Sequence, residues 1–130
     1  MGTRSSGDER GAVAVEFVLM APLLLLILFA VIAYGRLFSE ISVMNSAARE
    51  GGRVAALRGS SGEVQSAVTD AANPYTVSGS VSVSTTCTDD NRGDFVTVSW
   101  TQSFSDLSES LPFPLPMPAS QLIKSVFRCE

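Results

Sequence analysis

The feature that most constrains this chain is an uncharged apolar run at residues 17–35, close to the start of the sequence. Its nineteen residues are mainly Leu, Ile, Val, Ala and Phe. A helix of that length extends about 28 Å, which nearly matches the roughly 30 Å hydrocarbon thickness of a bilayer. A removable secretory signal has a shorter apolar core of about 7–15 residues, so the length favours a retained membrane anchor. The alternative is a secreted product cut after the small-residue stretch at residues 31–33, which would begin near Tyr34.

Composition and motif content argue against several classes of function. The chain has 130 residues, a net charge of −4 and no histidine, which leaves room for one small domain besides the anchor. It has no basic block of the kind that binds nucleic acid. No Walker, Rossmann, zinc or serine-hydrolase spacing is present, so we predict no enzyme, no cofactor and no metal site. Asp89, Asp90 and Asp94 could hold calcium, but they lack the EF-hand spacing and are expected to form a solvated turn.

The apolar run is predicted to be part of one long helix over residues 12–58. Residues 1–11 are short and polar, and no fold is expected for them. Pro22 removes a backbone hydrogen bond and is expected to kink the helix near its start. Beyond the bilayer, apolar residues continue at helical spacing on one face: Leu37, Ile41, Met44 and Ala48.

Two adjacent glycines interrupt this helical pattern, Gly51 and Gly52. Each costs about 1 kcal/mol relative to alanine in a helix interior. Either they hinge the helix, or another backbone packs closely against them. Three arginines lie near the same end, Arg49, Arg53 and Arg58. We expect these arginines to lie on a solvated face of the helix. The alternative is that they contact lipid headgroups or neighbouring subunits.

Residues 59–130 are predicted to form a small α+β domain with an antiparallel sheet of about three strands. Residues 63–73 have helical spacing and end at Asn73 before Pro74. Residues 77–87, 96–104 and 121–129 alternate apolar and polar side chains, and the first two runs form a hairpin around the turn at residues 89–94. Residues 111–118 have proline at every second position and are expected to be extended, either as a rigid connection or as a recognition surface.

The two cysteines, Cys87 and Cys129, fall on the apolar face of their predicted strands. A matched pair in a small exported domain indicates a disulfide, and two free buried thiols are the alternative. The positive-inside count slightly opposes a cytoplasmic N-terminus, because more arginines follow the apolar run than precede it. We give the cysteines more weight, and predict a single-pass protein of the cytoplasmic membrane with its N-terminus inside and its C-terminal domain outside.

The segment before the apolar run contains one carboxylate, Glu16, five residues after Gly11. A charge at a helix centre in hydrocarbon costs roughly 2.5–3.5 kcal/mol, so a residue placed there usually has a partner. If a peptidase cuts after Gly11, the new amine on Ala12 lies one helical turn from Glu16. In a bundle of such helices the two groups could pair, within one chain or between neighbours. The alternative is an interfacial glutamate that caps the start of the helix.

These residues resemble a known family. Gly11 followed by four small apolar residues, Glu16 and Phe17 is similar to the prepilin-peptidase site of type IV pilin-like proteins. The closest resemblance is to the TadE-like minor pseudopilins of tight-adherence, or Flp-type, pilus systems. The early Pro22 before a Leu-rich run resembles the helix of that family. The stretch 45–53 resembles its juxtamembrane segment, with Gly52 where alanine is commoner, and residues 126–130 resemble the ending of many members.

The resemblance implies a division of the chain and a set of partners. Residues 1–11 would be a cytoplasmic leader removed by a prepilin peptidase, residues 12–58 the transmembrane helix and its extension, and residues 59–130 the extracytoplasmic domain. Glu16 and Phe17 would serve in assembly of a fine adhesive pilus. The implied partners are other pseudopilins, the major Flp pilin, the peptidase and the inner-membrane assembly platform. The rival interpretation is a signal-anchored or secreted binding domain unrelated to pili.

Overall fold

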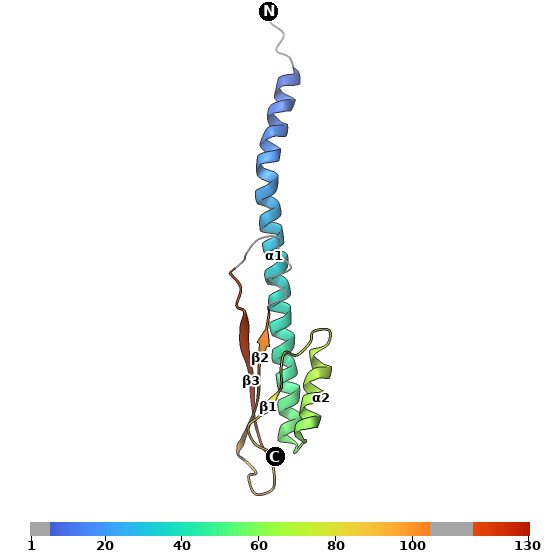
Figure 1. The fold of residues 1–130 in the computed structure, drawn as a ribbon, viewed down its shortest axis with the longest axis vertical. Coiled ribbons are helices and arrows are strands. Elements are labelled where there is room, and N and C mark those ends of the chain that lie inside the picture. The colour runs from blue at the N-terminus through green and yellow to red at the C-terminus, as the bar shows by residue number, and fades with distance from the viewer. Residues whose placement is uncertain (1–5, 105–115) are drawn as a thin grey trace, which may run out of the picture. The chain divides into compact units, whose positions relative to one another are not determined.

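The structure is a computed structural model that describes residues 6–104 and 116–130, the side chains of residues 6–10 excepted. Two helices precede three strands (Figure 1), which confirms the predicted α+β class. The elements are α1 (Ser6–Ala56), α2 (Ser61–Ala72), β1 (Ser82–Val83), β2 (Phe95–Ser103) and β3 (Ser120–Arg128). Of the proline-rich segment, residues 111–115 lie outside the described residues, and residues 116–118 have no regular structure.

Helix α1 is longer at its start than the sequence pattern predicts. It begins at Ser6, inside the segment expected to lack a fold, and not at Ala12. Once a helix exists, each further residue adds one hydrogen bond without a new nucleation cost, so extension over a short polar stretch is inexpensive. The helix continues through Pro22. The chain divides into two compact units, residues 1–35 and residues 36–130, and each is described separately below.

The second unit consists of the three-stranded sheet with α2 and the C-terminal part of α1 packed on one face. The sheet is antiparallel, in the order β1-β2-β3. Strand β2 alternates as predicted, with Val96, Val98 and Trp100 buried. These side chains share one core with residues of both helices. Burial of apolar surface contributes about 25 cal/mol per Å², so this shared core is the main source of the domain's stability.

The first predicted strand is mostly irregular, which corrects the expected range of 77–87. Only Ser82 and Val83 pair with β2. Two backbone N–H groups before them donate to side chains of other elements: Ser78 to Gln102 Oε1 at 3.0 Å and Val81 to Gln65 Oε1 at 3.1 Å. Gly79 between them has a φ of 77°, outside the strand region. The predicted side-chain alternation nevertheless persists, because Val77, Val81 and Val83 are half-buried and Cys87 is buried.

The glycine pair in α1 is a site of close packing and not a hinge. α1 continues as helix through Gly51 and Gly52 to Ala56. A Cβ at Gly51 would collide with Cγ2 of Val68 on α2, and a Cβ at Gly52 would lie 2.7 Å from Cε2 of Phe127 on β3. The two glycines therefore let α2 and β3 approach α1 from different sides. The groups that pack against the two glycines are side chains, whereas the alternative to a hinge predicted from the sequence was close packing of another backbone.

Helix α2 starts with a capping box. The Ser60 hydroxyl accepts a hydrogen bond from the backbone N–H of Glu63, and the Glu63 carboxylate accepts one from the backbone N–H of Ser60. The Ser60 N–H, followed by the Ser60 hydroxyl, holds the pKa of Glu63 below its ordinary value. The sequence contains the signal for this cap, a serine three residues before a glutamate.

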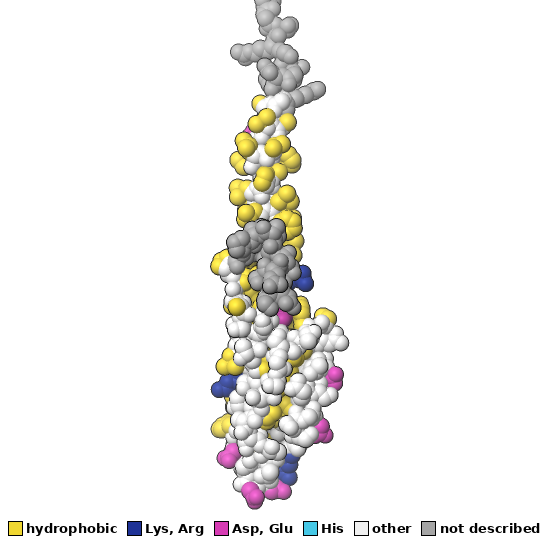
Figure 2. All heavy atoms as spheres, viewed as in Figure 1, with side chains coloured by type: hydrophobic (Ala, Val, Ile, Leu, Met, Phe, Trp, Pro, Cys, Tyr) yellow, Lys and Arg dark blue, Asp and Glu magenta, His cyan; other side chains and the backbone are white. Residues whose placement is uncertain are grey.

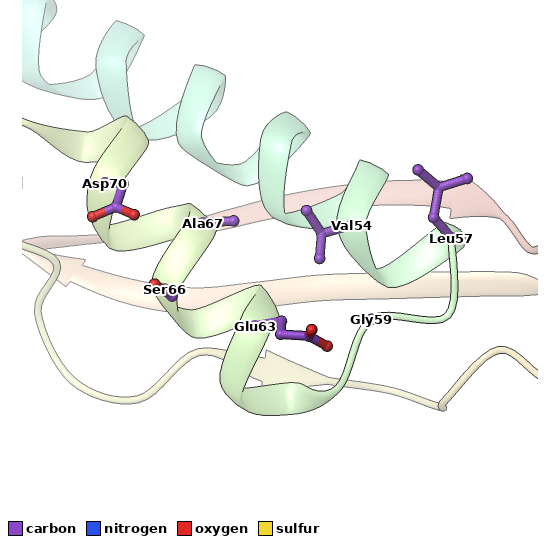
Figure 3. A pocket seen from close by; sticks show the side chains of 7 residues that line it. All are labelled: Val54, Leu57, Gly59, Glu63, Ser66, Ala67 and Asp70. Atoms are coloured by element: carbon purple, nitrogen blue, oxygen red, sulfur yellow. The ribbon is translucent and has the colours of Figure 1, made fainter.

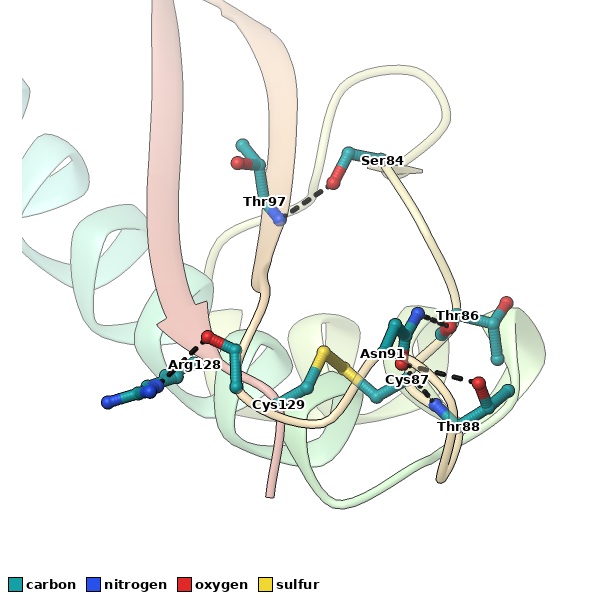
Figure 4. Close-up of a disulfide and its surroundings, with 9 residues drawn as sticks. Ser84, Thr86, Cys87, Thr88, Asn91, Thr97, Arg128 and Cys129 are labelled. Carbon is teal, nitrogen blue, oxygen red and sulfur yellow. Dashed lines mark hydrogen bonds between the residues drawn. A yellow bond between two sulfur atoms is a disulfide. The ribbon is translucent and has the colours of Figure 1, made fainter.

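The disulfide predicted from strand parity is confirmed (Figure 4). Cys87 and Cys129 are joined with their Cα atoms 5.4 Å apart, and both side chains are buried. Asn91 holds the adjoining loop, since its Oδ1 accepts from Thr88 N–H at 2.6 Å and its Nδ2 donates to the Thr86 carbonyl at 2.9 Å. The bond thus links the end of β3 to the connection between β1 and β2.

Candidate functional site

The residues predicted to carry processing and assembly lie together near the start of α1. Gly11, Ala12, Glu16 and Phe17 all belong to one continuous helical stretch, and their side chains are exposed. Glu16 is four residues after Ala12, so the two positions share a helix face, as the spacing predicts. Around Glu16 the exposed side chains are apolar, among them Val13 and Val15.

The apolar run forms a stem with hydrophobic side chains on all sides. Its most apolar window has a mean hydropathy of 2.8, and none of that window is buried within the chain. Figure 2 shows hydrophobic side chains covering the visible face of this helix. Among the described residues, α1 is the one helix long and apolar enough to cross a membrane. A helix that is apolar all round requires lipid or other protein around it, so the stem fits a membrane anchor.

Among the described residues, no side chain packs against Gly11. An added Cβ at Gly11 would meet nothing within 4 Å. Glycine costs about 1 kcal/mol relative to alanine in a helix interior, so its presence lowers the cost of unwinding the helix at this point. Pro22 lies inside α1, and the kink expected there stays a prediction.

Residues 45–53 of α1 have buried small residues on one side of the helix and exposed polar residues on another. Ala47, Ala48 and the glycine pair face the core. Asn45 and Ser46 are exposed and donate back to their own helix, to the carbonyls of Ile41 and Ser42. This part of α1 therefore packs small residues into the core of the second unit on one side and leaves a polar face on the other.

A comparison with protein families supports one interpretation of this helix. Residues 11–53 match the family model described as TadE-like protein. The match begins at Gly11 and includes Glu16, the stem and the glycine pair, and it confirms the resemblance identified from the sequence. The TadE-like match is consistent with a protein associated with the Tad pilus system.

The domain that follows the TadE-like segment lies outside that match. No curated protein and no solved structure matches the chain. The fold of residues 59–130 is therefore interpreted from its own contacts.

The three arginines near the end of α1 have different surroundings. Arg53 lies 3.8 Å from Glu50 in an exposed pair, which contributes little stability. Arg58 pairs with Asp89 of the loop before β2. Arg49 is exposed on the polar face of the helix. Among the residues that the structure describes, no group of three His, Cys, Asp or Glu side chains could hold a metal ion.

A shallow hollow lies between the end of α1 and α2 (Figure 3). Val54 of α1 and Leu57, just after the end of α1, form its apolar part, and Glu63 and Asp70 of α2 give it two carboxylates. Nothing in its lining provides a nucleophile paired with a base. We therefore treat it as part of the domain surface.

A buried polar network that the sequence analysis missed connects α1 to the sheet. Gln102 of β2 is only 1% exposed. Its Nε2 donates to Glu40 Oε1 and to the Thr76 carbonyl, each at 3.0 Å. Its Oε1 accepts from Ser78 N–H at 3.0 Å and from the Trp100 indole N–H at 3.2 Å. All four bonding positions of the amide are used. The available signal was a glutamine at an inward-facing position of a predicted strand.

Replacing Gln102 by leucine is expected to destabilise the domain by about 2–4 kcal/mol, because several buried groups would lose their partner. Urea unfolding of the full chain in detergent micelles, followed by fluorescence of the single tryptophan, measures the loss. Gln121 is the matched control, since it pairs with Gln102 across the sheet but is exposed. Equal unfolding midpoints for Gln102→Leu and Gln121→Leu would contradict the assigned role of the network.

Proposed function

We propose that this chain is a minor pseudopilin required for assembly of an adhesive pilus of the Flp or Tad type. It would insert through its N-terminal helix and be processed after Gly11. The observation that carries the proposal is the TadE-like match over residues 11–53, which covers both the cleavage motif and the unburied apolar stem. The chain acts in this proposal as a structural component and not as an enzyme.

Processing would take place at the Gly11–Ala12 bond on the cytoplasmic side of the membrane. A peptidase needs access to a backbone that the helix otherwise occupies with hydrogen bonds. Glycine makes local unwinding less costly at that residue, and Gly11 has no side-chain neighbours that oppose it. Removal of residues 1–11 leaves a charged amine on Ala12.

The new amine supplies a partner for Glu16. In a bundle of apolar stems an unpaired carboxylate is strongly penalised, whereas a paired one favours a single axial register. The exposed side chains next to Glu16 are apolar, so packing of the stems would remove this carboxylate from water. Phe17 is also exposed and would add apolar contact area at the same level.

The proposal implies a location and a set of partners. The mature chain would span the cytoplasmic membrane once, with the disulfide-linked domain outside. Its partners would be other pseudopilins, the major Flp pilin, the prepilin peptidase and the inner-membrane assembly platform. An oxidising compartment outside the membrane supports this orientation, since the disulfide lies in the C-terminal domain.

N-terminal sequencing of the protein extracted from membranes of pilus-producing cells tests processing. The proposal predicts a sequence that starts at Ala12. A start at Met1 or Gly2 would support an unprocessed anchor, and a start at Tyr34 would support a secreted domain. Either of those results would overturn the proposal.

Glu16→Ala is expected to leave cleavage largely intact and to reduce incorporation into pili by about tenfold or more, because the amine of Ala12 would lose its counter-ion. Immunoblots of sheared pili and of membranes measure incorporation and cleavage separately. Glu50→Ala is the control, since Glu50 is an exposed carboxylate on the same helix within residues 36–130. Normal piliation with Glu16→Ala would refute the role of this residue.

A further inference from the structure

The outer edge of β3 has backbone groups without hydrogen-bond partners among the described residues, and the sheet register identifies them. The Cys129 N–H donates to the Asp94 carbonyl at 2.8 Å, and the Phe104 N–H donates to the Ala119 carbonyl at 2.9 Å. These bonds lie at the two ends of the β2–β3 ladder, and bonding alternates along an antiparallel strand. Odd-numbered residues of β3 therefore bond to β2, and the N–H and C=O groups of Leu122, Lys124 and Val126 point away from the sheet.

This edge lacks most of the usual protection against pairing. β3 is nine residues long and contains no proline or glycine. Among the described residues, none hydrogen-bonds to the outward backbone groups of Leu122, Lys124 or Val126. Leu122 and Val126 are 63% and 50% exposed on the outer face of the sheet. Native proteins normally protect such an edge with short strands, bulges, proline or charged side chains, especially lysine, and of these β3 has only the charges of Lys124 and Arg128.

The opposite edge of the same sheet is protected. β1 is only two residues long. The N–H of Val81, immediately before it, is already taken by the Gln65 side chain of α2. In the part of the chain that the structure describes, the sheet therefore has one long open edge and one short covered edge.

We propose that the outer edge of β3 receives an extended strand from a different subunit of the pilus machinery, which adds a fourth strand to the sheet. This inference rests on the proposed function. Strand addition of this kind obtains affinity from main-chain hydrogen bonds and specificity from alternate side chains. The incoming strand would carry apolar residues beside Leu122 and Val126. It would carry acidic residues beside Lys124 and Arg128, because the outward positions of β3 have basic side chains and no acidic one.

Two ways of placing a second copy of this chain on the edge are unfavourable. Head-to-tail pairing would need the opposite edge, which is covered. Antiparallel pairing of β3 with β3 of a second copy, in the register centred on Lys124, would place two lysines side by side.

Membrane anchoring opposes the β3–β3 pairing as well. β3 and the part of α1 in the second unit run in the same direction, as two contacts show. The start of β3 lies near Glu40 of α1, because Gln121 is opposite Gln102 and Gln102 bonds to Glu40. Just beyond the end of β3, the Glu130 N–H donates to the carbonyl of Ala56, the last residue of α1. Antiparallel β3 strands would therefore point the two Arg36 ends in opposite directions, although both chains enter one membrane from that end.

Val126→Pro tests the edge in cells that make pili. The substitution removes an outward N–H that makes no bond within the domain, and edge strands tolerate proline at such positions. Val126→Thr is the matched control, because it keeps the N–H and the β-branched shape. We expect Val126→Pro to reduce pilus number at least tenfold, while Val126→Thr stays near the wild-type number. Urea unfolding followed by Trp100 fluorescence verifies that both variants fold, and Lys124→Glu provides a second variant that leaves the backbone unchanged.

The occupant is tested by a photo-crosslinking residue, p-benzoyl-phenylalanine, at Leu122, with Ser66 on α2 as the control position. We expect an adduct with a protein of different mass from position 122 alone, and loss of that adduct when Val126→Pro is added. An adduct of twice the chain's own mass would overturn the choice of partner. No adduct, or full piliation with folded Val126→Pro, would overturn the inference itself. If Glu16→Ala abolishes pili while Val126→Pro does not, the proposed function stands and only the strand addition fails.

Discussion

Removing the Cys87–Cys129 disulfide is expected to lower the free energy of unfolding of the C-terminal domain by about 4 kcal/mol. The two cysteines are 42 residues apart in sequence, so the bond closes a long loop in the unfolded chain. A small domain has limited apolar surface to bury and depends strongly on such a link. The Cys87→Ala, Cys129→Ala double variant should therefore unfold at much lower urea.

The location of the bond explains what is lost locally. Cys129 follows the last residue of β3, and Cys87 lies in the long connection between β1 and β2. Figure 4 shows this connection beside the end of β3, with Asn91 bonded within it. Without the covalent link, we expect the part of the connection around Cys87 to loosen first, because the hydrogen bonds of Gly93 and Asp94 to Cys129 still hold the other part of the connection to the end of β3.

The measurement uses the full chain in detergent micelles and the fluorescence of Trp100, which is buried in the core. Wild-type protein treated with a reducing agent should unfold at the same urea concentration as the double variant. The double variant should not respond to the reducing agent. If reduction shifts the unfolding free energy of the wild type by less than about 1 kcal/mol, the chain-entropy argument does not apply to this domain.

Side-chain periodicity was sufficient to predict much of this fold. The parity of Cys87 and Cys129 within alternating runs placed both on the core side, and the disulfide follows from that. Leu37, Met44 and Ala48 are buried as their helical spacing predicted. These successes share a cause, because a strand or helix that buries one face imposes its period directly on the sequence.

Features that depend on distant partners were not predictable in the same way. The spacing of apolar residues before Cys87 indicates a strand, but pairing fails where Ser78 and Val81 donate to glutamine side chains on other elements. Gln102 itself bonds to Glu40, which is 62 residues away. The sequence left open whether the glycine pair is a hinge or a site of close packing. Its neighbours, Val68 and Phe127, lie on other elements and are identified only in the folded structure.

The site at the start of α1 was predictable for a different reason. Gly11, Glu16 and the apolar run form a local motif, and the family match over residues 11–53 begins at the same glycine. The open edge of β3 had no such motif. It becomes visible only when the register shows which backbone groups of an alternating strand lack partners.

Gly51→Leu is expected to destabilise the domain by about 3 kcal/mol, at the upper end of the cost of overpacking a core. A Cβ at this position already collides with Cγ2 of Val68, a short side chain that is fully buried. Val64 and Val98 lie close on the same side, at 3.5 and 3.6 Å from the added atom, so the larger side chain has no space to occupy. Helix α2 would have to move away from α1, and the core that they share would be disrupted.

Gly62→Ala in α2 is the matched control, because the same type of residue there has room for a side chain. A Cβ at Gly62 would meet only the Ser60 hydroxyl, at 4.0 Å. That substitution should be neutral or stabilising by up to about 1 kcal/mol, the propensity difference between glycine and alanine in a helix. Urea unfolding of both variants by Trp100 fluorescence makes the comparison. If Gly51→Leu and Gly62→Ala unfold at the same urea concentration, α2 does not pack on α1 through the glycine pair, and the arrangement of the two helices described above is wrong.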